Sequence, residues 1–194
     1  AGCHADFAVG CGYKYLNGGP GAPAFLYVAP RHHGGFRQPL SGWFGHRDPF
    51  EFTPQYDAAG DIGQYLCGTP PVLSMVALDA ALDVWEGVNM TALRAKSQAL
   101  TGYFIELVET RCAGHGLTLI SPRNPDARGS QISFTHPEGG YAIISALIAE
   151  GVIGDFRAPD VLRFGFTPLY TSFADVWHAV DRMAAIMNER RWDK

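Results

Sequence analysis

Helical and strand-like segments alternate through the last hundred residues, and this alternation is the feature that most constrains the fold. Three stretches are predicted to be helices and four short apolar runs are predicted to be strands: residues 92–112, 141–150 and 173–190, and residues 117–121, 130–135, 153–157 and 161–164. Strands interleaved with helices in this order indicate a small α+β domain over residues 89–194.

The first part of the chain has a different pattern. Two apolar runs, residues 5–11 and 24–29, flank a turn cluster of Asn, Gly and Pro at residues 17–21. We expect two buried strands here, of the kind found in a sheet covered by helices on both faces. A long Gly- and Pro-rich stretch, residues 30–69, is usually functional. An amphipathic helix is then expected over residues 73–88, with Asn89 placed to cap the next one.

The charge balance argues against one broad class of function. Fifteen basic and 19 acidic side chains give a net charge of −4, which does not suit a protein that binds nucleic acid by neutralising phosphates. No apolar run reaches the roughly 18–20 residues of a membrane span, and the start of the chain has no secretory signal. The start also lacks a methionine, so we expect either that something was removed at the start of the chain or that the chain is a piece of a longer protein.

The cysteines and histidines predict neither a disulfide framework nor a metal site. None of the four cysteines forms a C-x-x-C pair, and reduced cysteines in a cytoplasmic protein are the expectation; they are Cys3, Cys11, Cys67 and Cys112. The seven histidines lack the spacing of metal ligands.

One lysine stands where a ligand would bind. Lys14 lies between Tyr13 and Tyr15, directly after the first apolar run, and ligands of α/β sheets bind at the carboxyl ends of strands. A lysine in a partly desolvated pocket has a lowered pKa and can attack a carbonyl, as pyridoxal phosphate requires. The residue taken alone favours the plainer interpretation, an ordinary strand-end lysine that extends into solvent.

Four segments, taken in order, carry a family resemblance. "YKYLNGGPG" (13–21), "QPLSGWFGH" (38–46), "YLCGTPP" (65–71) and "LRFGFTPLYT" (162–171) resemble the C-terminal half of kynureninase, most closely its bacterial members. That family has the fold-type I, aminotransferase-like architecture and uses pyridoxal 5'-phosphate. The resemblance implies an α/β fold: part of a cofactor-binding large-domain sheet over residues 1–88, then a small α+β C-terminal domain over residues 89–194.

The resemblance implies cofactor-binding roles for four residues. Lys14 would bind the cofactor covalently and later act as the base that moves the Cα proton. Tyr13 would donate its hydroxyl to the cofactor phosphate and could serve as a proton donor near the γ-carbon of the substrate. Trp43, through its indole N–H, and Thr69, through its hydroxyl, would reach the phosphate of the neighbouring subunit. The sites would then lie at a homodimer interface.

Three residues are implied on the substrate side. Arg163 would hold the α-carboxylate with a planar, two-pronged contact that lysine cannot make. His46 could line the substrate. Gly68 stands where some relatives carry a larger polar residue, which bears on whether the 3-hydroxyl of the substrate ring is tolerated.

Plainer alternatives stay open for several of these residues. Trp43 could be a core or interface aromatic, and Thr69 could be a turn residue before two prolines. Arg163 could pair with Asp155 or Asp160 on the surface.

The reaction implied is hydrolysis of L-kynurenine to anthranilate and L-alanine, in tryptophan catabolism and NAD biosynthesis. In relatives, the acidic partner of the pyridine nitrogen, a histidine soon after it, the ring-stacking aromatic and a phosphate loop lie upstream of the Lys14 motif. Asp6 is no convincing substitute, because it lies within the strand that leads to Lys14. We therefore expect that the chain alone cannot hold the cofactor productively: it is either one fragment of a split or truncated gene product, or it needs an N-terminal partner chain. The first strands of the large sheet would then be missing, which would leave apolar edges exposed on residues 5–11 and 24–29. Two other classes remain open: another fold-type I enzyme, cysteine desulfurase-like or aminotransferase-like, and a non-catalytic dimerisation remnant.

Overall fold

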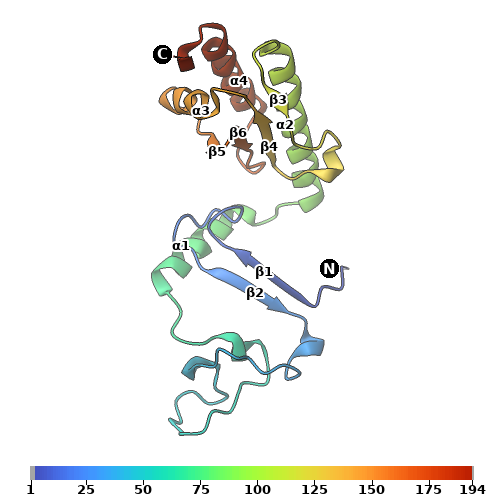
Figure 1. The fold of residues 1–194 in the computed structure, drawn as a ribbon. Helices are drawn as coiled ribbons and strands as arrows, with labels where there is room; N and C mark the ends of the chain where they lie inside the picture. Colours follow the sequence, from blue (N-terminus) through green and yellow to red (C-terminus); the bar gives the residue numbers. More distant parts are fainter. Residues whose placement is uncertain (1–2, 194) are drawn as a thin grey trace. The chain divides into compact units, whose positions relative to one another are not determined.

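The structure is a computed structural model that describes residues 3–193, and Figure 1 shows the course of the chain. The chain divides into two compact units, Ala1–Gly87 and Val88–Lys194, which we call unit 1 and unit 2. The division falls one residue before the boundary expected from the sequence. No helix within the described residues is both long and apolar enough to cross a lipid bilayer.

Unit 1 contains a two-stranded antiparallel sheet. β1 (Phe7–Cys11) pairs with β2 (Ala24–Val28), so that Phe7 lies opposite Val28. Both strands are largely exposed, and Val9 is 80% exposed. The expectation of buried strands is therefore wrong for this chain, whereas the exposure expected where neighbouring strands are missing is present. A two-stranded sheet has no neighbouring strands of its own to cover it. Helices over both of its faces would have to come from outside the described residues.

The Gly- and Pro-rich stretch of unit 1 contains short 3-10 helices. They are η1 (Pro30–His32), η2 (Trp43–Gly45) and η3 (Ile62–Tyr65). The helix α1 (Val72–Leu82) follows, and η4 (Asp83–Trp85) extends it. The predicted apolar stripe is wrong here, because apolar residues surround α1 and none of its residues is buried. A helix that is apolar on all sides normally lies inside a core.

Unit 2 is a four-stranded antiparallel sheet with helices on one face (Figure 1). The strands lie in the order β3, β4, β6 and β5: Thr118–Leu119, Gln131–Thr135, Val161–Gly165 and Asp155–Arg157. The helices are α2 (Met90–Arg111), α3 (Gly140–Ala149) and α4 (Phe173–Asn188). Two short 3-10 helices complete the unit, η5 (Pro125–Ala127) and η6 (Arg191–Asp193).

The core of unit 2 follows from the strand and helix periodicities. Alternate strand residues such as Ile132 and Phe134 of β4, and Leu162 of β6, are at most 1% exposed and meet the apolar faces of the helices. Phe104 of α2 lies 5.1 Å from Phe164, measured between ring centroids. Each such side chain contributes about 1.5–3 kcal/mol through burial.

The helices of unit 2 also begin with good caps. The Asn89 side chain accepts hydrogen bonds from the backbone N–H groups of Thr91 and Ala92, both at 3.0 Å, which confirms the predicted cap of α2. Ser172 and Asp175 form a reciprocal capping box at the start of α4. Unit 2 therefore combines a closed core with well-terminated helices.

Candidate functional site

The turn after β1 carries Lys14 and Tyr13. Backbone hydrogen bonds fix its shape: the N–H of Asn17 donates to the carbonyl of Lys14 at 2.9 Å, and the N–H of Gly18 to that of Gly12 at 3.0 Å. A Cβ atom at position 12 would come within 2.7 Å of the Pro23 carbonyl, so the end of the strand needs a glycine. Asn17 has a φ of 63°, a left-handed value that asparagine tolerates. The local sequence thus determines the shape of the turn that carries Lys14 at the end of β1.

The side chains of Tyr13 and Lys14 are both exposed. The amine Nζ of Lys14 lies 5.0 Å from the centroid of the Tyr13 ring, within cation–π range. Tyr15 on the other side packs against Trp85, with ring centroids 5.7 Å apart. Among residues 3–193, the side chain of Lys14 is thus exposed and the expected partly desolvated pocket is not formed.

Two loops of unit 1 pack tightly against each other and bring two predicted phosphate donors into adjacent segments. A Cβ at Gly42 would lie 1.8 Å from the carbonyl oxygen of Cys67, and the Cys67 thiol donates to the carbonyl of Leu40 at 2.7 Å. Trp43 follows Gly42 directly, and Thr69 is two residues beyond Cys67. Both side chains are exposed, as a donor to an outside group must be.

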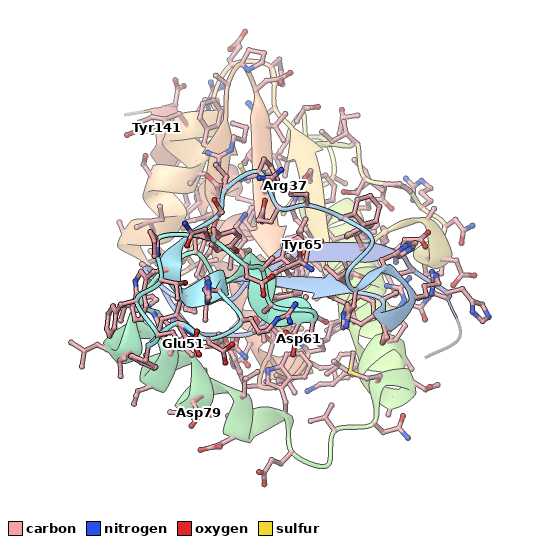
Figure 2. All side chains as sticks on the ribbon, turned by 90° about the horizontal axis from the view of Figure 1, so that it is seen from below. Arg37, Glu51, Asp61, Tyr65, Asp79 and Tyr141 are labelled. Atoms are coloured by element: carbon pink, nitrogen blue, oxygen red, sulfur yellow. The ribbon has the colours of Figure 1, made fainter. Side chains whose placement is uncertain are left out.

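The loops of unit 1 that follow η1 lie beyond the two strands. Figure 1 shows the turn after β1 beside α1, while the loops that follow η1 form a separate lobe. Figure 2 shows the side chains of this lobe from below, among them Arg37, Asp61 and Tyr65, with Asp79 on α1. The structure thus brings the segments that lead to Trp43 and Thr69 together at Gly42 and Cys67.

A pocket of about 350 Å³ adjoins Trp43 and His46. The His46 ring is engaged at both nitrogens: Nδ1 accepts from the N–H of Asp48 at 2.9 Å, and Nε2 lies 3.2 Å from the carbonyl of Gln55. The ring therefore carries its proton on Nε2 and holds the loop that walls the pocket. A contact between His46 and substrate stays a prediction.

Gly68 faces open space. A Cβ built at this position would meet no atom within 4 Å. The backbone there therefore accommodates a larger side chain, and the link between Gly68 and the substrate ring stays a prediction.

Arg163 belongs to unit 2. It lies on β6, opposite Asp155 of β5 and Ser133 of β4. Its Nη2 donates to the Asp155 carboxylate, so the surface pairing with Asp155 that the sequence left open is present, and the one with Asp160 is not among the ion pairs of the described residues. The hydrogen bond from Arg163 is the main cause that lowers the pKa of Asp155 below its usual value. The Nε atom of Arg163 is buried and has no hydrogen-bond partner in the described part of the chain.

The donor set of unit 1 fits two ends of pyridoxal phosphate. The indole N–H of Trp43 and the hydroxyls of Thr69 and Tyr13 are neutral donors suited to a phosphate, and the primary amine of Lys14 is the group that condenses with an aldehyde. Asp6 is already held by Arg31 and His32, at 2.6 and 2.5 Å. Within residues 3–193, no group of three or more His, Cys, Asp or Glu side chains could hold a metal ion.

Comparison with known sequences shows where the similarity lies. The family model described as the kynureninase C-terminal domain matches residues 93–183, which fall within unit 2. The kynureninase of Burkholderia mallei is 55% identical over 191 residues, an alignment that covers 98% of this chain and 46% of the relative. The chain thus spans about half the length of the curated relatives it matches.

Comparison with solved structures shows the fold. The cysteine desulfurase from Thermococcus onnurineus NA1 matches with a TM-score of 0.77 at 19% identity, covering 96% of this chain and 48% of that one. A variant of C-DES, with glycine covalently linked to its pyridoxal phosphate cofactor, matches with a TM-score of 0.69 at 18% identity, covering 93% and 46%. These likenesses confirm the predicted fold class, a mixed α/β chain that matches about half of a fold-type I enzyme.

Proposed function

We propose, from the premise that this chain corresponds to the C-terminal portion of kynureninase, that it supplies part of the site for hydrolysis of L-kynurenine to anthranilate and L-alanine. The observation that carries the proposal is 55% identity over nearly the whole chain, which includes the segments of Lys14, Trp43, Thr69 and Arg163. One water is consumed: its hydroxyl joins the acyl carbon of anthranilate, and a proton goes to the Cβ of alanine as the Cβ–Cγ bond breaks.

Unit 1 would hold the cofactor. When bound, pyridoxal phosphate supplies an electron-withdrawing ring that stabilises negative charge at the substrate Cα. Lys14 would bind it and move the Cα proton, and Tyr13 would donate to the phosphate and protonate near the γ-carbon. Trp43 and Thr69, on their paired loops, would donate to the phosphate held by a second copy of the chain.

Unit 2 would hold the substrate carboxylate. The Arg163 guanidinium offers donors in a planar fork, and its buried Nε has no partner in the described residues, so a carboxylate would satisfy a donor that is otherwise unpaired. His46 and Gly68 would border the substrate from the lobe of unit 1.

Activity would need residues that this chain does not contain. The exposed strands β1 and β2 and the exposed apolar helix α1 support a role for an N-terminal half that covers them. We further propose a cytoplasmic homodimer, as the family resemblance implies; the chain spans about half the length of the curated kynureninases it matches.

The test is to co-express the chain with the N-terminal portion of the Burkholderia mallei kynureninase and to follow anthranilate by its fluorescence. We expect turnover of L-kynurenine from the pair and none from the chain alone. Comparing 3-hydroxykynurenine in the same assay, for the protein as it is and for Gly68→Asn, tests the role of Gly68.

Lys14 is tested by borohydride reduction after addition of pyridoxal phosphate. The Lys14→Ala chain should lose both the trapped adduct and the activity, whereas Lys96→Ala, which changes a lysine of α2, should keep both. If the Lys14→Ala variant traps the cofactor as well as before, the covalent lysine lies in the N-terminal half. A trapped adduct without anthranilate would favour another fold-type I activity, and no adduct at all would favour a dimerisation remnant.

A further inference from the structure

Three residues form a row across the sheet of unit 2. Asp155, Arg163 and Ser133 lie directly opposite one another on β5, β6 and β4, and residues in register across antiparallel strands project from the same face. Their strand neighbours Leu162 and Phe164 are buried in the core beneath the helices. The row therefore lies on the face of the sheet that the helices of unit 2 leave open.

Asp155 holds Arg163 by one end of its guanidinium group. The carboxylate Oδ2 of Asp155 accepts from Nη2 of Arg163, while Nε of Arg163 remains buried without a partner in the described residues. The side chain of Arg163 is 29% exposed, so the surrounding atoms of unit 2 limit its rotation. A planar guanidinium group that is held at one nitrogen points its remaining N–H donors in a defined direction.

The charges around Asp155 do not cancel. The same Oδ2 atom also lies 3.2 Å from Nη2 of Arg157, so one carboxylate serves two guanidinium groups. Neighbours on this face of β4, Ser133 and Gln131, are neutral and hydrogen-bonded to each other at 3.3 Å. Together with Arg157, the row therefore keeps one positive charge in excess, which favours an incoming anion.

We propose that Asp155 is a positioning residue for Arg163: it orients the guanidinium toward the substrate carboxylate, and Arg157 offsets its negative charge so that the anion is not repelled. This inference rests on the proposed function, in which Arg163 is the carboxylate site. Partly exposed ion pairs of this kind contribute little to the free energy of folding, so a purely structural role for the Asp155–Arg163 pair would have only a small effect. Loss of Asp155 should therefore weaken substrate binding far more than folding.

The chain contains a matched control. Asp181 pairs with Arg111 elsewhere in unit 2, with side-chain exposures of 46% and 31%, against 45% and 29% for Asp155 and Arg163. In the complemented enzyme, Asp155→Asn should raise the KM for L-kynurenine about tenfold, a loss of the size expected when one charged partner is misplaced, with kcat within about twofold. Asp181→Asn should leave KM unchanged, and Asp155→Glu should restore part of the loss.

A second measurement reads the orientation directly and needs no turnover. In NMR spectra of the chain itself, the Nε–H of Arg163 should give a distinct, slowly exchanging signal, which Asp155→Asn moves into the envelope of mobile arginines and Asp181→Asn leaves in place. A signal that is unchanged in Asp155→Asn would overturn the inference.

The kinetic outcomes separate this inference from the proposed function. If Arg163→Gln raises KM but Asp155→Asn does not, the positioning role is wrong and the carboxylate site stands. If neither variant changes KM, Arg163 is not the carboxylate site and both fail. If Asp155→Asn lowers the melting temperature more than Asp181→Asn and leaves KM unchanged, its role is structural only.

Discussion

The two units bury their apolar residues to very different extents. Of the 22 hydrophobic residues classed as buried among residues 3–193, only Val28 and Ala29 lie in unit 1. Of the 29 large hydrophobic residues that are exposed, 21 lie in unit 1. Unit 2 has a core of its own, whereas the apolar residues of unit 1 are arranged as a surface.

This difference shows where folding energy resides. Stability comes chiefly from apolar area removed from water, so the chain on its own should be held together by unit 2. The strands and helix of unit 1 keep their local geometry through turns and hydrogen bonds, which contribute less. Exposed apolar patches of this extent are typical of surfaces that bind another polypeptide, which is the role proposed here for unit 1.

The largest expected contrast is in amide hydrogen exchange of the intact chain. Amides of β4 and β6 should exchange at least about 10³-fold more slowly than those of β1 and β2, because the former open only with the core and a two-stranded ribbon is marginal alone. Exchange measured by mass spectrometry or NMR checks this. Equal protection in both sheets would contradict the comparison, and slowing of β1 and β2 on adding the N-terminal half would sharpen it.

A matched pair of leucines gives the next effect. Leu147 of α3 is 0% exposed and Leu73 of α1 is 90% exposed. Leu147→Ala should lower the free energy of unfolding by about 2–5 kcal/mol through the cavity it leaves, and Leu73→Ala should change it by no more than about 0.5 kcal/mol. Urea titration followed by circular dichroism measures both. A comparable loss at Leu73 would mean that α1 is covered within this chain.

Cysteine labelling compares the units one residue at a time. Cys112 of unit 2 is 3% exposed, and burial raises its pKa to about 11, whereas Cys67 of unit 1 is exposed. Because only the thiolate reacts, iodoacetamide at about pH 8 should modify Cys112 at least about tenfold more slowly. Peptide mass spectrometry gives the two rates, and denaturation should make them alike. Equal rates in the native chain would show that unit 2 opens readily.

The smallest effect concerns pH. Burial lowers the pKa of His136 below its usual value of 6.5, and its Nδ1 accepts from the N–H of Gly139 at 2.9 Å. The unfolded chain therefore binds the proton first, so stability is fully present above about pH 6.5 and falls as the pH drops below it, by at most about 1.4 kcal/mol per pH unit. Urea midpoints for the native chain and for His136→Asn, which keeps an acceptor but cannot titrate, check this. An equal decline in both would assign the effect to other groups.

Unit 2 could largely be predicted from the sequence. The expected helix over residues 173–190 is α4 (Phe173–Asn188), and the expected strand over residues 161–164 is β6 (Val161–Gly165). Its strands alternate and its best helix, α4, has one apolar face, because each element packs against a neighbour within the unit. The periodicity of apolar residues predicts burial correctly when the element that covers them belongs to the same chain.

The same reasoning from apolar periodicity was less accurate for unit 1. The apolar runs that became β1 and β2 predicted burial, yet this chain leaves them exposed, and the stripe expected on α1 is absent. An apolar pattern predicts that a segment is covered, and it does not say whether the covering residues belong to the same chain. For the site, the sequence alone could not show that Gly42 packs on Cys67 or that both nitrogens of His46 are engaged.

The amino-acid order by itself determined the local features: the glycine and asparagine turn that presents Lys14, the Asn89 cap and the alternation that places Arg163 on a strand. These depend on neighbours within a few residues, whose dihedral preferences are set by covalent geometry. Only the tertiary structure decided that the loops of Trp43 and Thr69 pack together, and that Asp155 rather than Asp160 holds Arg163. Such contacts join residues far apart in sequence, and they depend on how whole elements pack, which no local pattern encodes.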